Sequence, residues 1–127
     1  MTNEQNIRPS ERFAGQTGVL DLEWEASDLL GRAIESEHGH TQRTLYRLGG
    51  ATIAMFALRE HAALPPHAAD GVVSVHVLRG RVRVHAGGET FELEAGRLIR
   101  MTPGLEHDLH AEAPSVVLVH IARGAMG

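Results

Sequence analysis

The fold is decided by residues 73–94, which read Val73-Ser-Val-His-Val-Leu-Arg-Gly80-Arg-Val-Arg-Val-His-Ala-Gly-Gly88-Glu-Thr-Phe-Glu-Leu-Glu94. Apolar and polar residues alternate on both sides of Gly80 and again after Gly88. A period of two residues is typical of half-buried strands, in which one face packs on a core and the other meets solvent or an interface. The stretch therefore predicts consecutive short strands.

The Gly87–Gly88 pair predicts a hairpin within this stretch, because a tight two-residue turn needs positive φ angles that glycine adopts freely. The turn sets a register in which apolar residues meet on the inner face and opposite charges meet on the outer face: Val84–Phe91, Val82–Leu93, Arg83–Glu92 and Arg81–Glu94. The charged pairs support this register. Exposed ion pairs contribute little energy, so they specify the pairing more than they stabilise it.

The rest of the chain continues the strand pattern after an N-terminal helix. Apolar or alternating segments at 52–58 and 117–121 are separated from their neighbours by turns rich in Gly, Pro and Asp, which is typical of a sandwich or barrel and not of βαβ units.

Residues 1–18 are polar, and we expect a mobile arm. A helix follows, with Ser27 as its cap, Gly39 at its C-terminal end, and an apolar stripe formed by Leu29, Leu30, Ala33 and Ile34. We therefore divide the chain into an arm and helix (1–43) and a β domain (44–127).

Composition excludes several classes of function. A chain of 127 residues with 43% hydrophobic and 22% charged residues is expected to form one globular domain. The formal charge of −4 argues against a dedicated nucleic-acid binder. Cysteine is absent, which excludes disulfides and thiolate metal sites, and no stretch is apolar enough for a membrane span. We expect a cytoplasmic protein. Nine histidines stand out, because neutral imidazole is the commonest metal ligand.

Two stretches carry a family resemblance. The first runs from His67 to Gly80, and the second is Gly96-Arg-Leu-Ile-Arg-Met-Thr-Pro-Gly104-Leu-Glu-His107. Together they resemble the cupin family, whose first motif is a Gly, five residues, His-x-His, three or four residues, Glu, six residues and a Gly. The second motif is a Gly, five residues, Pro-x-Gly, two residues, His, three residues and Asn. Five positions fit, namely His67, Gly80, Gly96, Gly104 and His107, and Pro103 stands one place past the family proline. The resemblance covers residues 44–122.

The departures from these motifs fall on the metal ligands. Ala69 replaces the second His, Val73 replaces the Glu, Ala111 replaces the Asn, and His61 stands where the first motif begins with Gly. The family's set of three His and one Glu is thereby reduced to His67 and His107. Two neutral imidazoles without a carboxylate bind a divalent ion poorly, because such ions prefer three or four ligands and some negative charge.

The other candidate ligands have the wrong strand parity to reach the barrel interior. Asp70 lies three residues after His67, and Glu106 and Asp108 flank His107. Four more histidines are expected off the inward face, as exposed turn or interface residues: His76, His85, His110 and His120. We expect His76 at a contact between subunits. His38 and His40 mark the end of the helix, where a cation suits the helix dipole.

The resemblance implies an all-β, cupin-type double-stranded β-helix, a jelly-roll barrel with a short N-terminal helix. It also implies a homodimer. The leading hypothesis is a small-molecule-binding protein with a degenerate metal site, acting as a sensor or accessory protein. Its predicted ligand pocket is formed by His67, Val73, Val75, Val77, Met101 and His107. One alternative is an enzyme, a dioxygenase or isomerase of a small acid or sugar, with one divalent transition metal held by His67, His107 and water. The other alternative is a non-catalytic dimerisation or interaction module.

Overall fold

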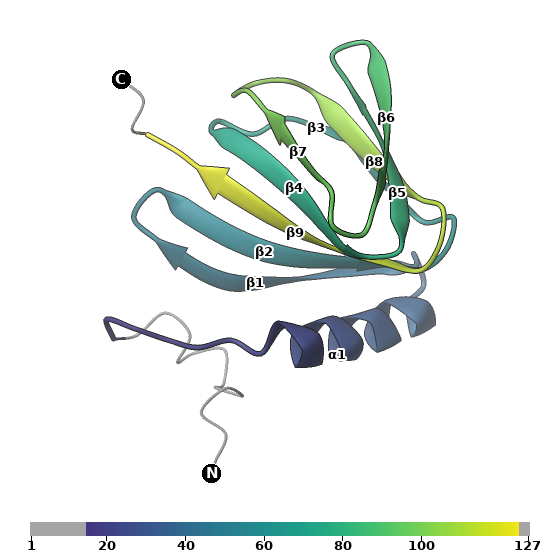
Figure 1. The fold of residues 1–127 in the computed structure, drawn as a ribbon, viewed down its shortest axis with the longest axis horizontal. Coiled ribbons are helices and arrows are strands. Elements are labelled where there is room, and N and C mark those ends of the chain that lie inside the picture. The colour runs from purple at the N-terminus through teal and green to yellow at the C-terminus, as the bar shows by residue number, and fades with distance from the viewer. Residues whose placement is uncertain (1–14, 125–127) are drawn as a thin grey trace.

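A computed structural model describes residues 15–124, so the expected mobile arm falls largely outside the described residues. These described residues form one helix followed by nine strands (Figure 1): α1 (Leu22–Glu35), β1 (His40–Leu48), β2 (Ala51–Leu58), β3 (Ala63–His67), β4 (Val72–Arg79), β5 (Arg81–Ala86), β6 (Glu89–Glu94), β7 (Leu98–Met101), β8 (His107–Ala111) and β9 (Ser115–Ala122). One antiparallel sheet has the strand order β1-β2-β9-β4-β7, and the other has the order β3-β8-β5-β6. The protein is a jelly-roll barrel, as predicted.

The two sheets enclose an apolar core. Inward side chains from both sheets form one buried cluster, which includes Leu58, Val82, Val84, Leu93 and Leu109. Burial alternates strictly along β5 and β8, and along β4 as far as Leu78, so the two-residue period seen in the sequence is realised in the barrel wall. Most of the barrel's stability comes from this shared interior.

The predicted hairpin is confirmed in every pair. In the β5–β6 ladder, Val84 pairs with Phe91 and Val82 with Leu93. Arg83 lies opposite Glu92 and Arg81 opposite Glu94, also as predicted. The ion pairs of both arginines nevertheless run to Glu112, which follows β8, at 3.3 Å from Arg81 and 3.5 Å from Arg83. The opposite charges of β5 and β6 therefore lie in the predicted register, although the closest ion pairs of the two arginines are formed with Glu112.

The helix packs on the outer face of the larger sheet, beside β1 and β2 (Figure 1). Its buried stripe is Ala26, Leu29 and Ala33, and it meets a second apolar cluster that includes Met55 and Leu118. The predicted cap was wrong, because Asp21 rather than Ser27 accepts the hydrogen bond from the backbone N–H of Trp24, at 3.1 Å. Ile34, placed in the stripe by the sequence, is exposed, because the buried face of the helix follows Ala26, Leu29 and Ala33 and Ile34 lies beside it.

Two backbone positions explain family glycines. Gly80 has φ +83°, and a side chain there would overlap the Pro114 carbonyl and the Ser115 hydroxyl. His61 has φ +74°, a left-handed conformation that glycine adopts more easily. His61 is the residue that stands where the first cupin motif begins with Gly. The backbone thus keeps the glycine conformation although the side chain has changed.

Candidate functional site

His67 and His107 come together at one end of the barrel. His67 ends β3 and His107 begins β8, and the two residues are paired across the ladder. Their ring centroids are 4.3 Å apart. The β3–β8 register shifts between Leu64 and His67, where Pro65 and Pro66 lack the N–H groups that a regular ladder needs. His107 is buried, with 7% of its surface exposed, whereas His67 is exposed. The pair therefore spans the mouth of the barrel from interior to solvent.

Both imidazole rings are oriented by backbone carbonyls. The Nδ1 atom of His67 lies 3.1 Å from the Pro65 carbonyl oxygen, and Nδ1 of His107 lies 3.1 Å from the Leu105 carbonyl oxygen. In the neutral form each Nδ1–H donates to its carbonyl, which leaves the Nε2 lone pair as an acceptor or a ligand. The two rings thus offer the same atom for binding.

The turn that precedes β8 is tied to the first motif. Gly104 has φ +83°, and its N–H donates to the Ala69 carbonyl at 2.8 Å. This bond links the loop that leads to His107 with the residue that replaces the second motif histidine. The spacing shared with cupins is thus realised as a contact between the two motifs at the barrel mouth.

The remaining residues of the predicted pocket lie inside the barrel. Val73, Val75 and Val77 point inward from β4, and Met101 on β7 pairs with Val73. All four belong to the buried apolar cluster, and Ala69 packs against it. The wall that cupins furnish with a second His and a Glu is therefore apolar here.

The residues at the barrel mouth do not fit the metal site of the family. A divalent transition metal needs three or four donors, and only His67 and His107 supply nitrogen there. Among residues 15–124, no third His or carboxylate forms a close ligand group with these two. The chemistry that the mouth can perform is hydrogen bonding by two imidazoles beside an apolar wall.

An open hollow of about 340 Å³ adjoins this mouth. It is lined by Pro66 and His107, by the β5–β6 turn at Gly87 and Gly88, and by His85 and Asp108 among others. The hollow gives His107 access to space on the side of the hairpin turn. A small molecule could therefore approach the buried ring from this direction.

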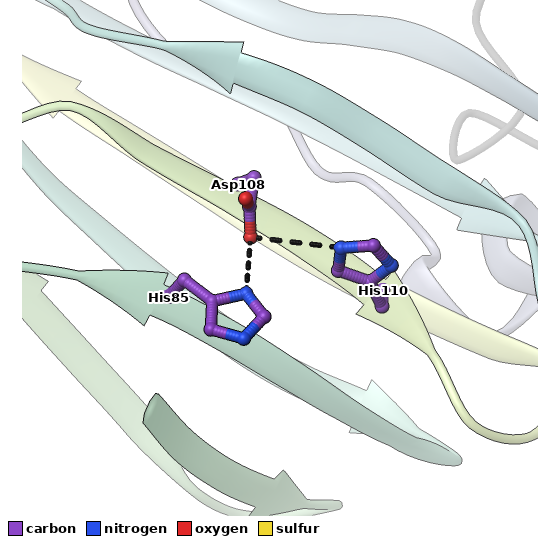
Figure 2. A group of neighbouring side chains, drawn as sticks. All are labelled: His85, Asp108 and His110. Carbon is purple, nitrogen blue, oxygen red and sulfur yellow. Dashed lines mark hydrogen bonds and ion pairs between the residues drawn. The ribbon is translucent and has the colours of Figure 1, made fainter. Parts of the chain in front are cut away.

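A second group of side chains gathers on the outer face of the smaller sheet, formed by His85, Asp108 and His110 (Figure 2). His85 lies directly opposite Asp108 in the β5–β8 ladder. The Asp108 Oδ1 atom is 2.7 Å from Nδ1 of His85 and 3.8 Å from Nε2 of His110. The hydrogen bond from His85 holds the pKa of the Asp108 carboxyl below its usual range.

The sequence predicted the orientation of this group but not its assembly. Asp108 and His110 do face away from the barrel interior, as their parity requires. His85, however, lies within β5 rather than in a turn. The available signal was the Asp108-x-His110 spacing, which puts both side chains on one face of a strand. The missing information was that β5 pairs with β8.

Comparisons with solved structures agree with this architecture. A conserved protein of unknown function from Streptococcus pyogenes is 23% identical, with a TM-score of 0.70 over 89% of this chain and 93% of that one. KdgF from Halomonas sp. is 18% identical, with a TM-score of 0.64 over 71% of this chain and 85% of that one. A cupin superfamily protein from Desulfitobacterium hafniense is 10% identical, with a TM-score of 0.68 over 89% and 96%. Identities this low show a shared fold alone.

Comparisons of sequence give the family. No curated protein sequence matches the chain. Within residues 15–124, α1 lacks the length and apolar character needed to cross a membrane. Residues 52–121, which run from β2 to β9 and include both cupin motifs, match the AraC-like ligand binding domain. The chain therefore belongs to the AraC-like ligand binding domain family and has the fold of a small cupin.

Proposed function

We propose that the protein binds a small organic molecule at the mouth of the barrel and acts as a sensor or accessory protein. His67 and His107 would hold the polar part of the ligand, and Val73, Val75, Val77 and Met101 would form the apolar wall. The observation that carries the proposal is the His67–His107 pair, with both Nε2 atoms free of the carbonyls that hold Nδ1. The family's description as a ligand-binding domain supports it.

The chemistry of the pair favours a small acid or a sugar. A neutral imidazole accepts a hydrogen bond from a hydroxyl group through Nε2, and a protonated one donates to a carboxylate. Ala69 and Val73, at positions where cupins carry metal ligands, make this end of the barrel apolar and favour the carbon skeleton of an organic ligand over an ion. The ligand would thus be recognised by two polar contacts and by shape.

The enzyme alternative retains one supporting observation. Metal-ligating histidines almost always donate their other ring N–H to a carbonyl or carboxylate, as the Nδ1 atoms of His67 and His107 do here. A divalent ion on the two Nε2 atoms would still need water, or a chelating substrate, for its remaining positions. The missing carboxylate makes this the second candidate.

Two copies of the chain are expected to pair. The support is limited to two exposed leucines on the outer face of the larger sheet. Leu48 lies on the edge strand β1 and Leu98 on the opposite edge strand β7, with 72% and 53% of their surfaces exposed. Light scattering coupled to size-exclusion chromatography measures the mass directly. A monomer at every concentration would exclude the homodimer, and it would leave of the third candidate only a module that binds a different protein.

The test of ligand binding uses ligand-observed NMR with a panel of hexoses, uronic acids and hydroxy acids. We expect saturation transfer to at least one class with the wild-type protein, lost in the His67→Gln variant. His67 is exposed, so this variant keeps the fold, and His107→Gln provides the buried counterpart. His120→Gln is the matched control, because His120 lies on the larger sheet and faces away from the barrel interior. Equal signals in all variants, or none from any panel member, would count against the proposal.

Metal analysis separates the two leading candidates. The untagged protein is purified and its metal content measured, with His67→Ala as the comparison. Stoichiometric metal that disappears in His67→Ala would favour the enzyme. Metal that survives in His67→Ala does not come from the barrel mouth and leaves the organic-ligand proposal in place.

A further inference from the structure

The group formed by His85, Asp108 and His110 has the composition of a metal site. Two imidazoles and one carboxylate are a common donor set for divalent transition metals. The group lies outside the barrel and shares no residue with the His67–His107 pair (Figure 2). It also differs from the positions at which the cupin motifs place their ligands. The two groups nevertheless border the same open hollow, because His85, His107 and Asp108 all line it.

The distances fit a tetrahedral ion. Zinc bonds to nitrogen and oxygen of about 2.0–2.2 Å imply ligand atoms roughly 3.3 Å apart at tetrahedral angles. The two Asp108 distances, 2.7 Å to His85 and 3.8 Å to His110, lie on either side of that value. All three ligand atoms lie within 4.8 Å of one another. Small rotations of the three side chains would therefore equalise the distances around an ion.

The strands hold these side chains in place. His85 and Asp108 are directly paired, and His110 follows two residues along the same face of β8. Backbone ladder bonds on both sides of β5 fix this arrangement, because β5 also pairs with β6. The rings of His85 and His110 meet edge to face at 5.5 Å between centroids. Ligands carried by paired strands need little ordering when an ion arrives.

The charged side chains around His85, Asp108 and His110 are compatible with a bound cation. Asp108 supplies one negative charge, and its carboxylate is 22% exposed, so the site stays open to solvent. A positively charged residue on the same face of the ladder is Arg83, which pairs with His110 in register. The Arg83 guanidinium is drawn toward Glu112 on the far side of His110, with Nε 3.5 Å from the carboxylate. Glu112 thereby offsets the repulsion between Arg83 and a bound ion.

We propose that His85 Nδ1, Asp108 Oδ1 and His110 Nε2 bind a divalent transition metal, with Zn²⁺ as the preferred ion and water in the fourth position. The ion displaces the proton that the His85–Asp108 hydrogen bond holds between the two groups. An open fourth position and an exposed setting suit a regulatory ion or a contact with a donor side chain of another molecule.

The test is isothermal titration of the untagged protein with ZnCl₂. We expect one site in the wild type, and at least tenfold weaker binding in each of His85→Gln, Asp108→Asn and His110→Gln. Three controls retain wild-type affinity: His61→Gln, an exposed histidine elsewhere, and His67→Gln and His107→Gln at the barrel mouth. Loss of binding in the barrel-mouth variants with no change in the other three would overturn the proposal. So would equal affinity in every variant, which is the mark of adventitious binding.

A second measurement does not depend on any variant. Paramagnetic Co²⁺, added below stoichiometry, broadens the NMR signals of residues near the ion. We expect the imidazole signals of His85 and His110 to broaden first, with those of His67 and His120 retained. Broadening that begins at His67 and His107 would contradict the assignment even if all variants fold poorly.

Discussion

Arg43 holds α1 against the sheet. Removing its side chain should lower the free energy of unfolding more than the loss of any other single surface ion pair. Its guanidinium lies 2.7 Å from Glu25 and 2.7 Å from Asp28, both on α1, and Arg43 itself is on β1. Glu25 is 1% exposed, and the Arg43 side chain is 19% exposed. The perturbation is Arg43→Met, which keeps the length of the side chain and removes its charge.

The two contacts of Arg43 contribute unequally. Removing one partner of a buried ion pair costs about 3–5 kcal/mol, because the remaining charge loses its compensation. The partly exposed guanidinium argues for the lower end of that range. Asp28 is 25% exposed, so its contact adds less than about 1 kcal/mol. We expect Arg43→Met to lower the free energy of unfolding by about 3 kcal/mol, out of roughly 5–15 for a domain of this kind.

Urea unfolding followed by two probes measures the effect. The single tryptophan, Trp24, lies on α1 and reports on the helix, whereas far-UV circular dichroism reports on the whole chain. In Arg43→Met we expect the Trp24 transition to shift to lower urea, ahead of the other probe if the helix detaches first. Arg43→Met combined with Glu25→Leu should recover most of the loss, because an apolar pair replaces a buried carboxylate that has lost its ion pair with Arg43.

A loss below 1 kcal/mol in Arg43→Met, or a double variant no more stable than the single one, would refute this account.

The dependence of stability on pH in the acid range gives a further check. Hydrogen bonding to Arg43, and then to Arg32, holds the pKa of Asp28 below its ordinary value of 3.8. A carboxyl with a lowered pKa in the folded state stabilises the fold above its unfolded pKa, and that contribution disappears as the pH falls through the folded pKa. The wild type should therefore lose more stability than Arg43→Met below about pH 4.

Three further outcomes are expected, each read from urea midpoints. Gly80→Ala should lower the free energy of unfolding by about 3 kcal/mol, because it adds a steric overlap to an unfavourable φ. Gly88→Ala should lower it by only about 1 kcal/mol, because Gly88 has φ +80° but open space around it. Equal losses in the two variants would contradict the packing argument. His61→Gly should stabilise by about 0.5–1 kcal/mol, because relief of the left-handed backbone exceeds the entropy that glycine adds to the unfolded chain; a destabilised variant would show that the ring matters. Burial, and next the charge of His76, lower the pKa of His120 in the folded state, so protonation below about pH 6.5 favours unfolding. His120→Gln should accordingly lose less stability than the wild type between pH 7.5 and 5.5, and identical losses would rule this histidine out.

Local pattern was sufficient to predict the strands and their inward faces, whereas the jelly-roll barrel itself was predicted from the resemblance to cupins. The alternation around Val82 and Val84, with the glycine pair at the turn, determined the hairpin register residue by residue. Parity along β8 correctly separated inward His107 from outward Asp108 and His110. Both inferences succeed because a strand's two faces follow from its backbone geometry alone.

Features that depend on distant pairing were not predictable in the same way. His85 and Asp108 are 23 residues apart, and they meet because β5 pairs with β8 as well as with β6. The contact of Arg43 with Glu25 likewise depends on where α1 docks. The helix start was missed for a local reason: Asp21 and Ser27 are both good caps, and only the packing of the first turn decides between them.

The two faces of strand β8 each carry a histidine, and the two histidines belong to different groups of side chains. His107 and Leu109 face the barrel, while Asp108 and His110 face outward. Sliding the strand by one residue would exchange the two sets and bring a carboxylate beside His67, which is the donor that the barrel mouth lacks. Burial of Leu109 and Ala111 opposes such a slip. One inserted or deleted residue before β8 would thus bring a carboxylate to the barrel mouth without any substitution of the residues that line it.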